Sequence, residues 1–82
     1  KFNEAYDKYV KASSVTKNKK QIAAAFHNLG NALMEEKQYE KSIEAYKQSL
    51  KSNPKDDETR YNLAVAQYML RQQQKQQQQQ QK

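Results

Sequence analysis

His27 is the chain's single histidine, and its imidazole is the side chain best suited to act as a general base or a metal ligand. It has no second histidine and no cysteine to complete a metal site, and no nucleophile arrangement accompanies it. The sequence also lacks a glycine-rich phosphate loop, paired catalytic carboxylates and an RNA-binding signature. We therefore predict that the chain is not an enzyme and binds no cofactor or metal, and that His27 is a polar residue with neither a catalytic nor a metal-binding role.

A basic surplus offers a second kind of chemistry. Lysine and arginine outnumber aspartate and glutamate, 15 to 9, which gives a formal charge of +6. Such a surplus can attract acidic proteins, nucleic acid or anionic lipid. Lys17, Lys19 and Lys20 form its densest group, but the other lysines are spread along the chain, as is typical of a solvated surface. Nucleic-acid or anionic-surface binding is therefore kept as an alternative function.

The elements that must position these residues are helices. Apolar residues recur at spacings of three and four along four segments. Asn18 and Asp56 are suitable N-cap residues, and Pro54 forces the residue before it out of the helical conformation. Aromatic residues such as Phe26 and Tyr46 fall on the apolar stripes, so we expect them to pack in a core. The predicted helices cover about residues 2–13, 18–37, 39–51 and 57–70.

The C-terminal tract has a different composition. Residues 72–82 are glutamine except for Lys75 and Lys82, so they have no apolar face to bury. We predict a Gln-rich tail or linker, into which the last helix extends before it frays. The chain has no cysteine and no apolar run near the ~20 residues that span a bilayer. Lys1 begins no signal-like segment, so we expect a piece of a longer protein.

Residues 23–56 resemble one complete unit of the tetratricopeptide-repeat (TPR) family, whose repeat is about 34 residues long. Leu33, Ser42 and Ser49 depart from the residue types that are usual at their positions. The two serines still have the small side chains that those positions require. Gly30 is expected to face Ser42 where two helices cross, because glycine inside a helix costs about 1 kcal/mol and implies a packing reason. The matching positions are Phe26, Leu29, Gly30, Leu33, Ser42, Tyr46, Ser49 and Pro54.

The flanking segments extend this resemblance. Residues 1–22 are similar to the second helix of a preceding unit plus a loop, residues 57–71 to the first helix of the next unit, and residues 72–82 form the tail or linker. The resemblance implies an all-α fold, in which antiparallel helix pairs form an α-solenoid fragment of about four helices. The first and last helices would lack partners, so we expect self-association by swapping or end-to-end stacking.

The resemblance also implies a function. First helices of TPR units line a concave groove, so the chain should be a protein–protein interaction scaffold that binds a peptide segment or a partner domain. Asn28 and Asn62 match in successive helices and could bind a peptide backbone or hold the helices together. The TPR mode that grips a C-terminal carboxylate needs a lysine where His27 stands, so we do not expect it. The positions expected to face or border the groove are His27, Asn28, Asn31, Met34, Glu35, Glu58, Tyr61, Asn62 and Val65.

A narrower similarity concerns the order of segments. The run NLGNAL, then YEKSIEAYKQSLKSNP, DETRYNLAVAQ and a glutamine-rich tract, is similar to TPR proteins of the aerotolerance (Bat) operons of Bacteroides and relatives. The tract directly after the repeat carries most of this similarity. It implies a stress complex at the cell envelope or periplasm, with von Willebrand A-domain proteins as partners.

Overall fold

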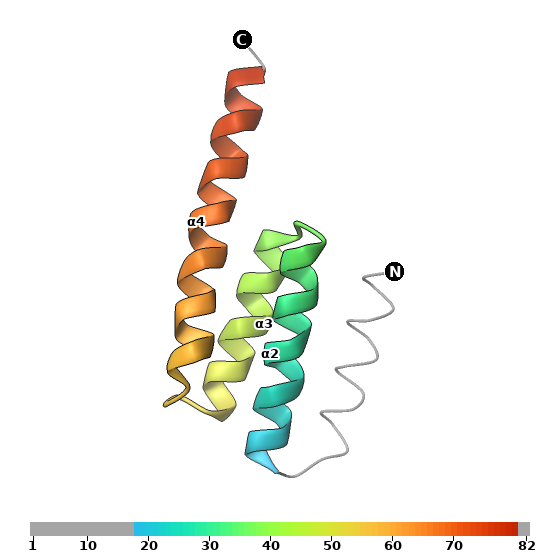
Figure 1. Ribbon diagram of the computed structural model, residues 1–82, viewed down its shortest axis with the longest axis vertical. Coiled ribbons are helices and arrows are strands. Elements are labelled where there is room, and N and C mark those ends of the chain that lie inside the picture. The colour runs from blue at the N-terminus through green and yellow to red at the C-terminus, as the bar shows by residue number, and fades with distance from the viewer. Residues whose placement is uncertain (1–17, 81–82) are drawn as a thin grey trace.

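The computed structural model describes residues 18–80, and within them the chain forms three α-helices (Figure 1). They are α2 (Lys19–Glu35), α3 (Tyr39–Ser52) and α4 (Asp57–Gln80). α3 runs antiparallel to α2 and to α4 and packs against both. The predicted all-α fold is therefore confirmed. The helix predicted for residues 2–13 lies outside the described residues.

The boundaries of α2 follow from local hydrogen bonds. The Asn18 side chain accepts bonds from the backbone N–H groups of Lys20 (2.9 Å) and Gln21 (3.3 Å), which confirms it as the N-cap. At the other end, Lys37 has a φ of 60°, in the left-handed region. The N–H of Lys37 donates to the carbonyl of Met34, and the N–H that follows donates to the carbonyl of Leu33. This pattern is a Schellman motif with lysine where glycine is favoured.

The remaining boundaries also lie near their predicted places. α3 ends at Ser52, just before Asn53 and Pro54. Asp56 caps α4, because its carboxylate accepts a bond of 3.3 Å from the backbone N–H of Thr59. α4 then continues to Gln80 through most of the glutamine tract and projects past the turn between α2 and α3 (Figure 1).

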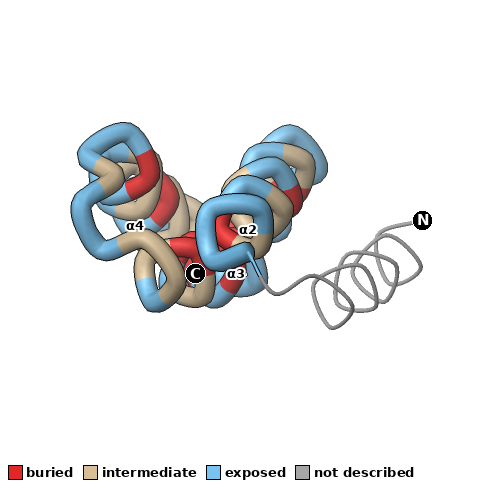
Figure 2. The backbone as a smooth tube through the Cα atoms, turned by 90° about the horizontal axis from the view of Figure 1, so that it is seen from below, coloured by how far each residue is buried: buried red, intermediate tan, exposed pale blue. Residues whose placement is uncertain are grey.

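The buried residues gather where α3 meets its neighbours (Figure 2). Between α2 and α3, Leu29, Leu33 and Ala45 form a buried cluster, and Phe26 packs against it. A second cluster joins α4 to α2 and α3. Its buried members are Ile43, Tyr46 and Ala66, with Met34, Leu63 and Leu70 packed around them.

Small residues let α2 and α3 approach closely. The Ser42 hydroxyl donates to the carbonyl of Gly30 at 2.9 Å, so the predicted contact between these residues is confirmed. Ser49 makes the same kind of bond to the carbonyl of Ala23, at 2.7 Å. The side chain that requires glycine, however, is Tyr46, because a Cβ at Gly30 would lie 2.5 Å from its Cδ1 atom. Tyr46 is only 1% exposed and cannot move into solvent.

Gly30→Ala is therefore expected to lower the free energy of unfolding by about 1 kcal/mol or more. Overpacking a core costs about 1–3 kcal/mol, which outweighs the ~1 kcal/mol that alanine gains in helix propensity. Urea denaturation measures the change, with Ala24→Gly at an exposed site of α2 as the control for propensity alone. The Tyr46→Leu substitution should cost less in the Gly30→Ala background than in the native chain. An alanine variant more stable than the native chain would contradict this account.

Lys37→Gly should raise the free energy of unfolding by about 0.5–1 kcal/mol, since the left-handed conformation strains any residue with a Cβ. Thermal unfolding followed by circular dichroism would measure the gain. Glu36→Gly is the matched control at the neighbouring position, where φ is −83°. That control should lower stability, and equal effects of the two glycines would show that the Lys37 backbone is not strained.

Candidate functional site

A cavity of about 180 Å³ lies between α2 and α4, above α3. It is lined by Asn31 and Met34 of α2, Tyr46 of α3, and Asn62 and Val65 of α4. The fold thus brings together four residues predicted to face a groove and adds Tyr46, which was predicted only as a packing residue.

Hydrogen bonds fix the polar side of this cavity. Asn31 Oδ1 accepts a bond of 2.5 Å from the Tyr46 hydroxyl and a bond of 3.3 Å from Asn62 Nδ2. Burial raises the pKa of the Tyr46 hydroxyl, which keeps the phenol protonated as a donor. The two bonds occupy the acceptor sites of Asn31 Oδ1. The Asn31 amide nitrogen and the Asn62 carbonyl oxygen therefore remain to contact a ligand.

The size of the cavity limits what it can accept. Cavities for drug-sized molecules or cofactors measure about 300–1,000 Å³, whereas about 150 Å³ suffices for benzene. The cavity here is suited to one medium-sized side chain. Met34 and Val65 supply apolar walls, and the two asparagines supply polar groups at its rim.

His27 belongs to a polar network that joins α2 to the start of α4. Its Nδ1 lies 2.6 Å from the hydroxyl of Thr59, which donates to Asp56 Oδ2, also at 2.6 Å. Because the hydroxyl has one proton, His27 Nδ1 must carry the hydrogen in its own bond. Nε2 of His27 lies 3.9 Å from a carboxylate oxygen of Glu58. The imidazole therefore positions the two helices, and Thr59, which is fully buried, was missed because its partner lies 32 residues away.

Four other residues predicted for the groove do not line the cavity. Asn28, Glu35, Glu58 and Tyr61 are exposed. Of the two roles considered for Asn62, the structure shows a bond between helices, to Asn31. A peptide-binding role for these residues stays a prediction.

The structure describes only part of the lysine group that could bind nucleic acid or an anionic surface. Lys19 and Lys20 are exposed at the start of α2, whereas Lys17 lies outside the described residues. Within residues 18–80, no group of three or more histidine, cysteine, aspartate or glutamate residues is placed to hold a metal ion. No helix in the same range is long and apolar enough to cross a membrane.

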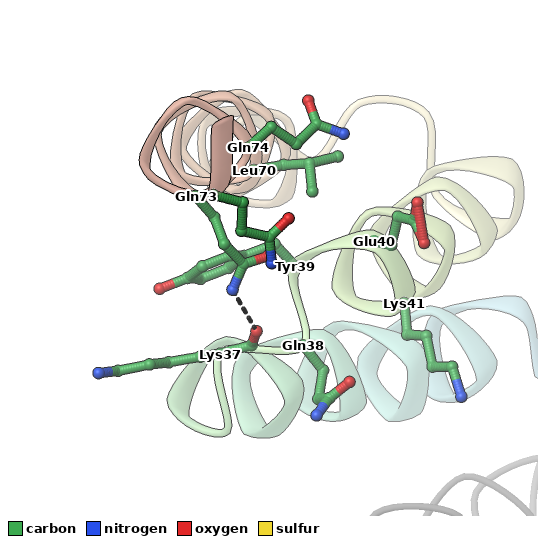
Figure 3. A pocket seen from close by; sticks show the side chains of 9 residues that line it. Lys37, Gln38, Tyr39, Glu40, Lys41, Leu70, Gln73 and Gln74 are labelled. Carbon is green, nitrogen blue, oxygen red and sulfur yellow. Dashed lines mark hydrogen bonds between the residues drawn. The ribbon is translucent and has the colours of Figure 1, made fainter. Parts of the chain in front are cut away.

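A second hollow, of about 270 Å³, lies between the α2–α3 turn and the glutamine part of α4 (Figure 3). Gln73 Nε2 donates to the carbonyl of Lys37 at 3.4 Å, and Leu70 and Tyr39 lie beside this bond. These contacts hold the first glutamines against the turn. This hollow could not be predicted from the sequence, because the glutamine tract has no apolar pattern to mark a packed face.

Thr59→Val should flatten the dependence of stability on pH. The Thr59 hydroxyl is the main cause that lowers the pKa of Asp56, so its contribution is complete above the unfolded pKa of about 3.9. That contribution is lost as the pH falls through the lower pKa of the folded chain. Thermal unfolding between about pH 5 and pH 2 should therefore show a steeper loss for the native chain than for the variant. Parallel curves would contradict the Asp56–Thr59 coupling.

Comparison with known proteins adds one finding to this geometry. Residues 30–70 match the model of the TPR repeat, and this segment covers half of the 82 residues. It contains about the last third of α2, all of α3 and the apolar half of α4. No curated protein and no solved structure matches the chain. The match and the packed helix pair agree, and the chain belongs to the TPR repeat family.

Proposed function

We propose that this chain binds an extended segment of a partner protein in the groove between α2 and α4. TPR repeats act in general as protein–protein interaction scaffolds, which sets the class of partner. The observation that carries the proposal is the cavity flanked by two asparagine side chains. One side chain of the ligand would enter the cavity, and its backbone would lie across the rim.

The free polar atoms support an extended ligand. The Asn31 amide nitrogen can donate to a backbone carbonyl, and the Asn62 carbonyl oxygen can accept from a backbone N–H. An extended peptide presents both groups, whereas a helical ligand uses most of its backbone groups internally. The apolar walls from Met34 and Val65 suit an aliphatic or phenyl side chain.

The charges around the groove argue against a ligand with a C-terminal carboxylate. No lysine or arginine lines the cavity, and the exposed carboxylates of Glu35 and Glu58 stand one helical turn from Asn31 and Asn62. A carboxylate placed there would meet like charge and no cationic donor. An internal segment of the partner avoids this cost.

The sequence resemblance also suggests which complex the chain belongs to. An envelope-associated aerotolerance complex with von Willebrand A-domain proteins remains a prediction, which rests on the sequence resemblance alone. The groove would be the surface that such a partner contacts.

Filling the cavity should abolish peptide binding. Peptides selected from a random display library on the folded chain provide the probes, and fluorescence anisotropy measures their affinity. Val65→Phe should weaken the selected peptides by at least tenfold, since the new ring occupies the space for the ligand's side chain. Gln67→Phe, at an exposed position of α4, is the matched control and should leave affinity unchanged. The proposal would be overturned if the two substitutions changed peptide affinity equally, or if neither changed it.

A further inference from the structure

The outer side of α4 carries a continuous row of exposed residues. Leu63 and Ala66 of α4 pack against Ile43 and Tyr46 of α3, and the helical period places the row on the opposite side of α4. Tyr61 is 70% exposed and Tyr68 is 53% exposed, and they are the exposed large hydrophobic residues of the described chain. The members of the row alternate in spacing by four and three, and they are Asp57, Tyr61, Ala64, Tyr68, Arg71 and Lys75.

Two positions of α4 are poorly suited to pack a further helix in the way that α2 packs α3. Phe26 and Leu33 of α2 pack in the cluster against α3. One repeat later the corresponding positions are Arg60 and Gln67, and both are exposed. The Arg60 guanidinium also donates to the Asp57 carboxylate (2.6 Å) and to the carbonyl of Pro54. A following helix packed on these two positions would bury a charged pair and an amide, which disfavours that packing.

The row is complementary to itself in the reverse direction. Its first member is acidic (Asp57), its last two are basic (Arg71 and Lys75), and its centre holds one small residue between two tyrosines. Alternating spacing by four and three is the pattern by which two helices pair along a seam. A parallel pair would place like charges together, whereas an antiparallel pair places acid against base.

We propose that the outer face of α4 binds the same face of a second copy of this chain, in an antiparallel, two-fold symmetric dimer. Asp57 meets Lys75 of the second copy, and Ala64 leaves room for the ring of Tyr68 of the second copy. The guanidinium of Arg71 lies over the ring of Tyr61 of the second copy, and the face of that aromatic ring attracts the cation. The symmetry makes each contact occur twice.

This arrangement also places residues 72–75 of α4 beside the start of the second copy's α4. α4 has 24 residues and a length of about 36 Å, and its last turns project beyond α2 and α3. A helix that is polar all round gains little from packing on its own chain. Two small tyrosine clusters bury less than the ~1,200 Å² of a strong interface, so the dimer is weak and forms at high protein concentration. It differs from the swapping or end-to-end stacking predicted from the sequence, and it uses none of the residues that line the cavity.

Sedimentation equilibrium of the full chain, over a concentration series, tests the proposal with a reciprocal charge exchange. Asp57→Lys alone and Lys75→Asp alone should each weaken dimerisation by about three- to tenfold, because each variant loses two exposed ion pairs. The double variant Asp57→Lys/Lys75→Asp should restore the native dissociation constant. Replacing both Tyr61 and Tyr68 by serine should abolish the dimer, with circular dichroism confirming that each variant keeps its helices.

Matched controls separate this effect from net charge. Glu44→Lys and Lys47→Asp make the same charge changes at exposed positions of α3 and should leave dimerisation unchanged. A chain that stays monomeric at every concentration would overturn the proposal. So would a double variant that dimerises no better than the single variants, or controls that weaken the dimer equally.

Discussion

The ring of Tyr46 lies directly on the backbone of α2 at Gly30, and much of the arrangement follows from this contact. It sets how closely α2 and α3 approach, and Ser42 and Ser49 fit the same narrow space by donating to carbonyls of α2. These bonds satisfy two fully buried hydroxyls, which would otherwise destabilise the core. A larger side chain at Gly30 would separate the helices and leave these donors without acceptors.

The same tyrosine links the core to the groove. Its hydroxyl binds Asn31, and Asn31 in turn binds Asn62 on α4. The orientation of the two asparagines therefore depends on a buried ring and not on flexible surface side chains. In the proposed binding mode, side chains held in this way lose little conformational entropy when a ligand arrives.

A second set of polar bonds fixes the start of α4. Asp56, Thr59 and His27 form a chain of short hydrogen bonds from the N-cap of α4 to the middle of α2. Together with the apolar contacts of Leu63 and Ala66, they hold the first half of α4 in place. The cavity lies beside these contacts, with residues of α2, α3 and α4 in its walls.

Local patterns in the sequence determined the helices and their ends. The period of the apolar residues gave α2, α3 and the first half of α4, and Asn18, Asp56 and Pro54 marked boundaries through bonds to near neighbours. The contact of Gly30 with Ser42 was predictable because a mid-helix glycine implies close packing. Tertiary structure alone decided that Tyr46 is the ring over Gly30, that His27 binds Thr59, and that Asn31 and Asn62 meet at a cavity. Those contacts join residues far apart in the chain, and they depend on the angle and spacing of packed helices, which no local pattern encodes.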